Sequence, residues 1–277
     1  MKKILFYLAI SISLLFTTSC KDDNDAPTPD SKTLVKSFNI DLSASNAVPI
    51  VAGRSENGTL AMSLYSDNSL EFTITINGLA TTDNLTAAHL HSGNPVETGS
   101  IAIPLVDGTT IAFSGNTATG TITLTSGEVT ALQGSDIYAN IHSSEVAAGL
   151  LRGQVDQTLT GAYNIALSPD NQVPVLAGRS EDGIAYFRLV GTKMYYKVVV
   201  NNLDASDAIS NGHIHEGTAT ENGGVFVSLG ITANDQLSIS KIITLTDTEV
   251  TKMNNDALYV NIHSNQAGGG LIRGQIR

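Results

Sequence analysis

The chain contains 277 residues, which is enough for two domains of ordinary size. Only 15% of the residues are charged, and the formal net charge is −11 at pH 7. This charge argues against nucleic acid as a partner, because phosphate binding needs a basic surface. It also argues against simple electrostatic docking on an anionic membrane. Abundant Thr, Ser, Val and Ile, with 25 Gly, favour strands joined by tight turns.

The first twenty residues predict an export signal rather than a folded element. Lys2 and Lys3 form its positive end, and residues 4–16 form an apolar run too short to span a bilayer comfortably. The run is followed by Cys20, the only cysteine in the chain. This arrangement resembles a bacterial lipobox, and the resemblance implies that Cys20 is lipidated and becomes the mature N-terminus. We therefore expect the membrane to be one partner, through a lipid anchor at Cys20.

Residues 21–33 predict a disordered tether, because they contain Pro27, Pro29 and many polar side chains. Within them, residues 21–25 are similar to the acidic export signal of surface lipoproteins in Bacteroidota. This resemblance implies a protein anchored in the outer membrane and facing the cell surface. Since no cysteine follows Cys20, the folded domains must be stabilised by their cores alone.

The rest of the chain consists of two copies of one unit. Two segments of the first copy recur in the second, 46–58 as 171–183 and 151–155 as 272–276. Each copy is about 120 residues long, the size of a domain rather than of a solenoid repeat. We therefore expect two tandem domains, residues 34–156 and 157–277.

Within each copy the hydrophobic period is two, as in the alternating polar and apolar residues of 71–76 and 120–124. Asn57-Gly58 and Asp182-Gly183 are dipeptides that favour type I′ hairpin turns. The pattern predicts an all-β protein, in which each copy is an antiparallel, immunoglobulin-like β-sandwich of about seven to nine strands.

One short helix is expected in each copy. Thr125 and Glu128 have the spacing of a capping box, in which each side chain accepts a hydrogen bond from the other residue's backbone. Thr246 and Glu249 have the same spacing in the second copy. No other segment shows sustained helical periodicity.

Three segments of the second copy resemble the CHRD domain, which was named from chordin and also occurs in bacterial exported proteins. They are residues 212–217, 259–263 and 269–275, and each has a counterpart in the first copy. The resemblance covers the chain from about Leu34 to Arg277 as a tandem pair. It implies a β-sandwich in an extracellular setting, and for bacterial members it implies a fold rather than an activity.

The six histidines occupy matching positions in the two copies: His89, His91 and His142, then His213, His215 and His263. Strand alternation places His89 and His91 on one face, about 7 Å apart, with Leu90 on the opposite face. If the strand that carries His142 is a neighbour, three imidazoles converge. Three neutral imidazoles with a fourth position left for another ligand would suit zinc or copper.

A glutamate follows each histidine pair at the same distance, Glu97 after His91 and Glu221 after His215. Each carboxylate is a candidate fourth ligand or general base from the following loop. Arg54 and Arg179 also occupy matching positions in the two copies. Each has a glutamate two residues later as a candidate ion-pair partner.

The same recurrence is consistent with a purely structural hydrogen-bond network. Its candidate members, beside the histidines, are Tyr138, Asn140, Arg152, Tyr259, Asn261 and Arg273. Two hypotheses therefore remain open. The first is a non-enzymatic surface lipoprotein that binds an extracellular or envelope protein or ligand, or has an adhesive or structural role. The second is a metal-binding protein or metal-dependent enzyme with three histidines in each domain. An enzyme is the less favoured class, because the chain lacks a nucleophile elbow, a P-loop and a dinucleotide fingerprint.

Overall fold

The computed structural model describes residues 32–134 and 136–277. The predicted signal peptide, the lipidation residue Cys20 and the tether up to residue 31 lie outside the described residues. In the part of the chain that is described, no helix is long and apolar enough to cross a membrane.

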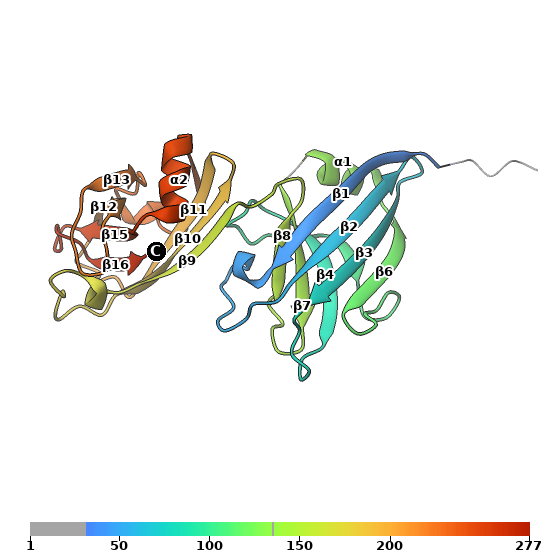
Figure 1. Ribbon diagram of the computed structural model, residues 1–277, viewed down its shortest axis with the longest axis horizontal. Helices are drawn as coiled ribbons and strands as arrows, with labels where there is room; N and C mark the ends of the chain where they lie inside the picture. Colours follow the sequence, from blue (N-terminus) through green and yellow to red (C-terminus); the bar gives the residue numbers. More distant parts are fainter. Residues whose placement is uncertain (1–31, 135) are drawn as a thin grey trace, which may run out of the picture. The chain divides into compact units, whose positions relative to one another are not determined.

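The described part of the first copy forms eight strands in two layers (Figure 1). One layer has the order β6-β3-β2-β1 and the other the order β5-β4-β7-β8. The layers join at one corner, where Ser43 at the end of β1 pairs with Arg152 in β8. The strands are β1 (Leu34–Ser43), β2 (Asn57–Tyr65), β3 (Ser69–Asn77), β4 (Leu85–Ser92), β5 (Ile101–Val106), β6 (Thr117–Thr123), β7 (Ile137–Ser143) and β8 (Leu151–Gln154).

The second copy repeats this plan as two four-stranded sheets, of orders β14-β11-β10-β9 and β13-β12-β15-β16. A single bridge between Ser168 and Arg273 stands where β1 meets β8 in the first copy. The strands are β9 (Gly161–Leu167), β10 (Asp182–Val190), β11 (Lys193–Asn201), β12 (Ile209–Glu216), β13 (Val225–Ser228), β14 (Lys241–Thr244), β15 (Leu258–Ser264) and β16 (Ile272–Gln275). The predicted all-β fold with two tandem antiparallel sandwiches is confirmed.

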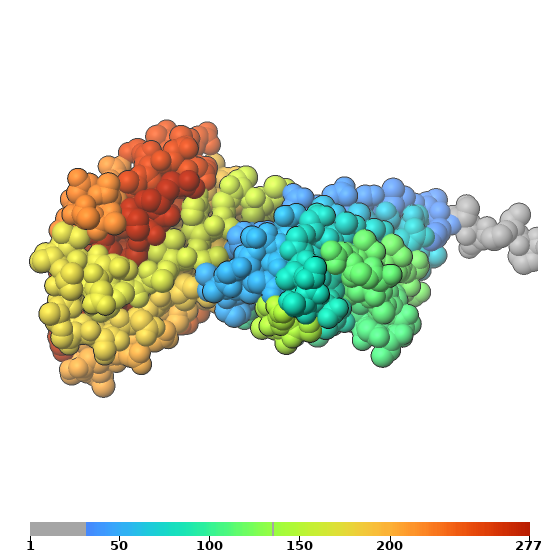
Figure 2. All heavy atoms as spheres, turned by 60° about the horizontal axis from the view of Figure 1, so that its bottom comes forward, coloured from blue at the N-terminus to red at the C-terminus, as the bar shows by residue number. Residues whose placement is uncertain are grey.

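Each sandwich has its own apolar core, built from the inward residues of alternating strands. In β3, Phe72, Ile74 and Ile76 are buried, whereas Thr73 and Thr75 between them face outward. Each fully buried side chain of this size contributes about 1.5–3 kcal/mol relative to leaving it in water. Figure 2 shows the outer atoms of the two copies on one face, coloured by residue number.

The predicted helices are present as α1 (Ser126–Gly134) and α2 (Asp247–Asn255), and short 3-10 turns occupy residues 44–46, 169–171 and 234–236. Thr246 caps α2, because its side chain accepts a hydrogen bond from Glu249 N while the Glu249 carboxylate accepts one from Thr246 N at 2.7 Å. Thr125 and Glu128 make the same reciprocal bonds at α1. Both predicted capping boxes are confirmed.

The hairpin turns predicted at Asn57-Gly58 and Asp182-Gly183 are wrong, because these dipeptides begin β2 and β10. Gly58 does not have a positive φ, so glycine is not needed at this position for its backbone conformation. Instead, a Cβ added at Gly58 would lie 2.3 Å from the carbonyl oxygen of Thr75 on the neighbouring strand. The glycine therefore permits a close approach between two strand backbones.

Candidate functional site

The His-x-His segment of the first copy lies on β4, which pairs with β7 in antiparallel register. In this register His89 is opposite Asn140 and His91 is opposite Tyr138. Leu90, between the two histidines, is completely buried in the core. Because side chains alternate along a strand, burial of Leu90 turns both histidines to the outer face of the sheet.

The three histidines of each copy converge on that outer face, as predicted. In the first copy the ring centroids are 5.0, 5.8 and 6.3 Å apart, and in the second 5.2, 5.5 and 5.9 Å apart. One ring nitrogen from each histidine can be chosen so that all three lie within 4.8 Å of one another. The two groups are His89, His91 and His142, and His213, His215 and His263.

Two of the three rings in each group are oriented by backbone carbonyls. In the first copy, Nδ1 of His91 lies 3.0 Å from the Gly99 oxygen, and Nδ1 of His142 lies 2.9 Å from the Ala147 oxygen. A carbonyl oxygen only accepts, so both Nδ1 atoms carry the proton and both Nε2 atoms present a lone pair. The second copy repeats both bonds, His215 to Gly223 and His263 to Gly268, each at 3.0 Å.

The third histidine of each group, His89 or His213, contacts one of the other two rings through its Nδ1 atom. Nδ1 of His89 lies 3.2 Å from Nε2 of His142, and the corresponding atoms of His213 and His263 lie 3.4 Å apart. Nε2 of His91 and Nε2 of His215 are buried, and neither atom has a hydrogen-bond partner. Each group therefore contains one buried acceptor nitrogen that no donor of the described residues satisfies.

Five of the six histidines have a lowered pKa. Burial and, to a smaller extent, the neighbouring rings of His142 and His91 together lower the pKa of His89 to about 4, since positive charges at this distance repel. Burial also lowers the pKa of His91 and of the three histidines in the second copy. These rings are consequently neutral near pH 7, and neutral imidazole is the form that binds metal ions.

Tyr138 and Arg152, expected from the sequence in a structural network, form a layer behind His91. The Tyr138 ring is stacked on the His91 ring, and the Arg152 guanidinium carbon lies 3.5 Å from the Tyr138 centroid. The buried Arg152 donates hydrogen bonds to the carbonyl oxygens of Glu97 at 2.7 Å and Asn94 at 2.6 Å. This layer fixes the loop that follows β4, including the carbonyl that orients His91.

Tyr259 and Arg273 build the same layer behind His215. The two aromatic rings are 5.0 Å apart with an interplanar angle of 9°, and the guanidinium carbon lies 3.4 Å from the Tyr259 centroid. Arg273 donates to the carbonyl oxygens of Thr218 at 2.7 Å and Glu221 at 2.8 Å.

Asn140 and Asn261 hold the second loop that supplies a carbonyl to the site. Asn140 Nδ2 donates to the Ala148 oxygen at 3.2 Å, next to the carbonyl of Ala147 that orients His142. Asn261 Nδ2 donates to the Gly269 oxygen at 3.3 Å, and its Oδ1 accepts from Gln172 Nε2 at 2.8 Å.

The structure does not bring Glu97 and Glu221 into the histidine groups. The Glu97 carboxylate accepts a hydrogen bond from Asn94 N at 3.2 Å, within its own loop. The Glu221 carboxylate accepts one from Thr218 Oγ1 at 2.7 Å. Both side chains therefore brace the loop rather than face the ring nitrogens.

The backbone partners of the histidines, above all Gly99 and Gly223, are functional positions that sequence reasoning missed. Each glycine lies eight residues after the histidine that it orients, and this equal spacing in both copies was the available signal. A Cβ at either position would meet a backbone oxygen, so only glycine lets the loop close this tightly.

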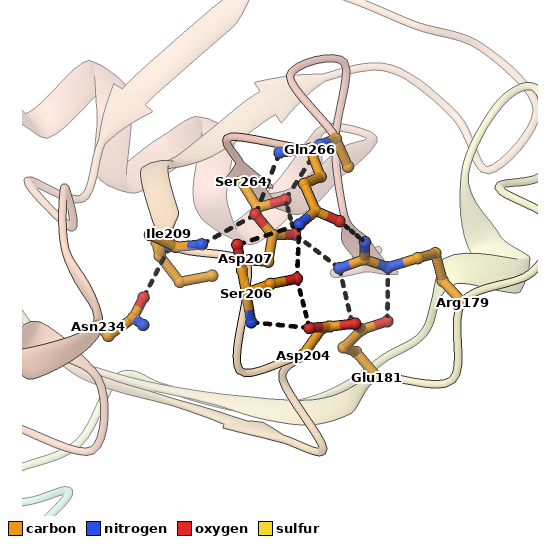
Figure 3. A network of polar contacts seen from close by, with 11 residues as sticks. Arg179, Glu181, Asp204, Ser206, Asp207, Ile209, Asn234, Ser264 and Gln266 are labelled. Carbon is orange, nitrogen blue, oxygen red and sulfur yellow. Dashed lines mark hydrogen bonds and ion pairs between the residues drawn. The ribbon is translucent and has the colours of Figure 1, made fainter.

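Arg179 and its partners form a second polar cluster, at the loops beyond the sheet edge (Figure 3). The predicted ion pair with Glu181 is present at 2.7 Å, and Arg179 also pairs with Asp207 at 2.6 Å. Asp207 in turn accepts hydrogen bonds from Ser264 Oγ and Gln266 N. Arg54 makes the matching pairs in the first copy. With its charges already paired, this cluster ties loops together.

The CHRD domain model matches residues 38–155 and again residues 163–276. The two matches cover most of the chain, and the protein therefore belongs to the CHRD family. Its two sandwiches are tandem CHRD domains, as the resemblance of the sequence implied. No curated protein and no solved structure matches the chain.

Proposed function

We propose that the protein is an exported lipoprotein that acts as a non-enzymatic binding module on the cell surface, with the two histidine groups as its binding sites. The lipid on Cys20 anchors it in the outer membrane, and residues 21–33 act as the tether. The tandem CHRD domains support the assignment as a binding module rather than an enzyme.

The observation that carries the proposal is the buried, unpaired Nε2 atom of His91, which recurs in His215. A buried polar atom without a partner costs about 1–3 kcal/mol, because it loses its bonds to water and gains none. Buried polar networks that serve stability satisfy the large majority of their members. The Oε1 atoms of Gln154 and Gln275 are also buried and unpaired. Only at His91 and His215 do two further imidazoles lie beside the unpaired atom, as expected of a site completed by a ligand.

The surroundings of the histidines also support a binding site. Stacking on Tyr138 and the carbonyl of Gly99 hold the His91 ring in one orientation before any ligand arrives. Such preorganisation reduces the entropy that binding would otherwise cost. Five of the six histidines are partly exposed and His215 is 8% exposed, so a ligand can reach each group from solvent past its less buried rings.

The proposal can be tested with the free energy of unfolding of the full-length protein, purified in detergent and kept in a metal chelator. In the double variant His91→Phe/His215→Phe, a phenyl ring can still stack on Tyr138 and on Tyr259, but the unpaired nitrogen is removed. If the groups are binding sites, its free energy of unfolding should stay within about 1 kcal/mol of the wild type, since the lost carbonyl bond and the removed cost offset each other. A loss above about 3 kcal/mol would mean that the histidines are there for stability.

A matched control shows that the assay detects structural residues. Arg152→Met/Arg273→Met removes the layer behind the same two histidines, and it should destabilise the protein strongly, because four loop carbonyls lose their donor.

A further inference from the structure

We infer that each histidine group binds one transition-metal ion of the zinc and copper class. The ligands are His89 Nδ1, His91 Nε2 and His142 Nε2 in the first domain, and the corresponding atoms of His213, His215 and His263 in the second. The inference rests on the proposed function, in which these groups are binding sites, and it names the chemical class of their ligand.

The first argument is the balance of donors and acceptors among the three nitrogens. His91 Nε2 and His142 Nε2 are both acceptors, because their Nδ1 protons are committed to the carbonyls of Gly99 and Ala147. The His89 Nδ1 proton can satisfy His142, and His91 then remains without a donor. A cation placed among the three nitrogens satisfies all of them at once.

The second argument is the spacing of the nitrogens. A tetrahedral ion with metal–nitrogen bonds of about 2.0–2.1 Å holds its ligand nitrogens about 3.3 Å apart. The separation is 3.2 Å between His89 Nδ1 and His142 Nε2, and 3.4 Å in the second domain. The ligand nitrogen of the third histidine lies within 4.8 Å of the other two in each group.

The third argument is the way in which the ligands are oriented. Metal-binding histidines usually donate their other ring proton to a carbonyl or carboxylate, which fixes the tautomer and makes the free nitrogen a better ligand. His91 and His142 both have such a carbonyl partner, and so do His215 and His263.

The ligand set indicates the class of ion. The groups contain imidazole nitrogens alone, without the oxygen ligands that calcium and magnesium require. Neutral imidazoles suit zinc and copper, and three protein ligands leave a position for water or another small ligand. When His89 binds through Nδ1, that atom releases its proton and Nε2 of the same ring takes one up, so the ring stays neutral.

The test is metal loading of the full-length protein in detergent, stripped with a chelator, dialysed against Zn²⁺ or Cu²⁺ and analysed for bound metal. The expected result is two ions per chain for at least one of the two metals, one for each group. His91→Phe should reduce this to one ion and His91→Phe/His215→Phe to none, with affinity at the altered sites lowered at least ~100-fold, since even second-shell changes cost 10–100-fold.

The matched control is Glu97→Gln/Glu221→Gln, which changes the two loop carboxylates that lie outside the ligand groups. This variant should still bind two ions. Where Cu²⁺ binds, its electron paramagnetic resonance spectrum should show nitrogen hyperfine structure in the wild type and the control, and should lose it in the histidine variant.

The inference fails if the folded wild type binds neither metal, or if the histidine double variant binds as much metal as the wild type. Failure of this kind differs from failure of the proposed function. If no metal binds while His91→Phe/His215→Phe keeps its stability in chelator, the groups remain binding sites for another ligand. If His91→Phe/His215→Phe unfolds in chelator, the binding-site proposal itself is wrong. The metal content of that variant can then no longer be interpreted, and His142→Gln/His263→Gln replaces it in the metal-loading test.

Discussion

The ring of Tyr138 lies nearly parallel to the ring of His91, with 5.1 Å between their centroids and 13° between their planes. The Tyr138 hydroxyl accepts a hydrogen bond from Gly99 N at 3.2 Å, while the Gly99 oxygen accepts the proton of His91 Nδ1. The tyrosine therefore fixes the histidine twice, once by stacking and once through the loop residue that both side chains contact.

Removing the guanidinium behind this tyrosine should destabilise the first domain. Arg152→Met leaves the carbonyl oxygens of Asn94 and Glu97 without their donor, at about 1–3 kcal/mol for each buried acceptor. We expect a loss of roughly 2 kcal/mol or more in the free energy of unfolding, measured by urea denaturation. Lys252→Met is the control, because its ion pair with Glu216 is exposed and should be worth less than about 1 kcal/mol. Equal effects of the two substitutions would contradict the role assigned to Arg152.

Alanine should be tolerated at Gly224 and not at Gly223. A Cβ at Gly223 would lie 1.6 Å from the Glu216 oxygen, whereas a Cβ at Gly224 has no heavy atom within 4 Å. Gly223→Ala must displace the loop and its carbonyl, so we expect a loss of about 2 kcal/mol or more and weaker metal binding at the second site. The thermal midpoint and the bound metal of both variants provide the measurement. Unchanged values for Gly223→Ala would show that the loop can move without cost.

The buried aspartates beside the arginines should make stability depend on acid pH. Burial alone would raise the pKa of Asp83, but hydrogen bonds from Arg54, Ser143, Ser144 and the backbone outweigh burial and hold this pKa below its ordinary value. The unfolded chain therefore binds a proton more readily, with a pKa of about 3.9. The stabilisation from Asp83 is complete well above that pH and is lost as the pH falls through the pKa of the folded state.

The measurement is the free energy of unfolding as a function of pH from neutral to about 2. Asp83→Asn should be less stable than the wild type at neutral pH and should show a shallower decline below pH ~4, because the titrating carboxylate is absent. Parallel curves for the two proteins would contradict the assignment. Asp207, whose pKa is lowered in the same way against burial by bonds from Ser264 and Gln266, predicts the same behaviour in the second domain.

Cys20→Ser should release the protein from the membrane fraction, since the lipid is the proposed anchor. Fractionation of cells that express the wild type or the variant provides the measurement, and accessibility to added protease on intact cells tests surface exposure. A variant that stays with the membrane would show that another feature anchors the chain.

Much of the fold could be predicted from the sequence, because the signals were local and present in both copies. Alternation such as that of Phe72 and Ile74 with Thr73 depends only on which face of a strand is buried. The capping box of Thr246 and Glu249 is a contact within one helical turn. The turn predicted at Asn57-Gly58 was wrong because a dipeptide carries no information about the neighbouring strand. The Thr75 oxygen of that strand lies too close to Gly58 for any side chain, so this position requires glycine.

The convergence of the histidines was predictable for the same reason, since it follows from strand alternation and one correct pairing of strands. The hydrogen-bond partners of Glu97 and Arg152 were not predictable, because they depend on how the loop after β4 closes. In that loop the Glu97 carboxylate turns back to Asn94 N, and Arg152 reaches in from β8 to the carbonyls. The equal spacing of Gly99 and Gly223 after their histidines marks these positions in the sequence, but the bond from each backbone oxygen to a ring is visible only in three dimensions.

All ligands proposed for the first ion come from β4 and β7, and all those for the second come from β12 and β15. Neither set includes a side chain from the other domain, so under the proposed function each copy of the repeat supplies one complete binding site. A chain with a different number of these repeats would carry a proportionate number of ions, and loss of one set would leave a working monovalent protein.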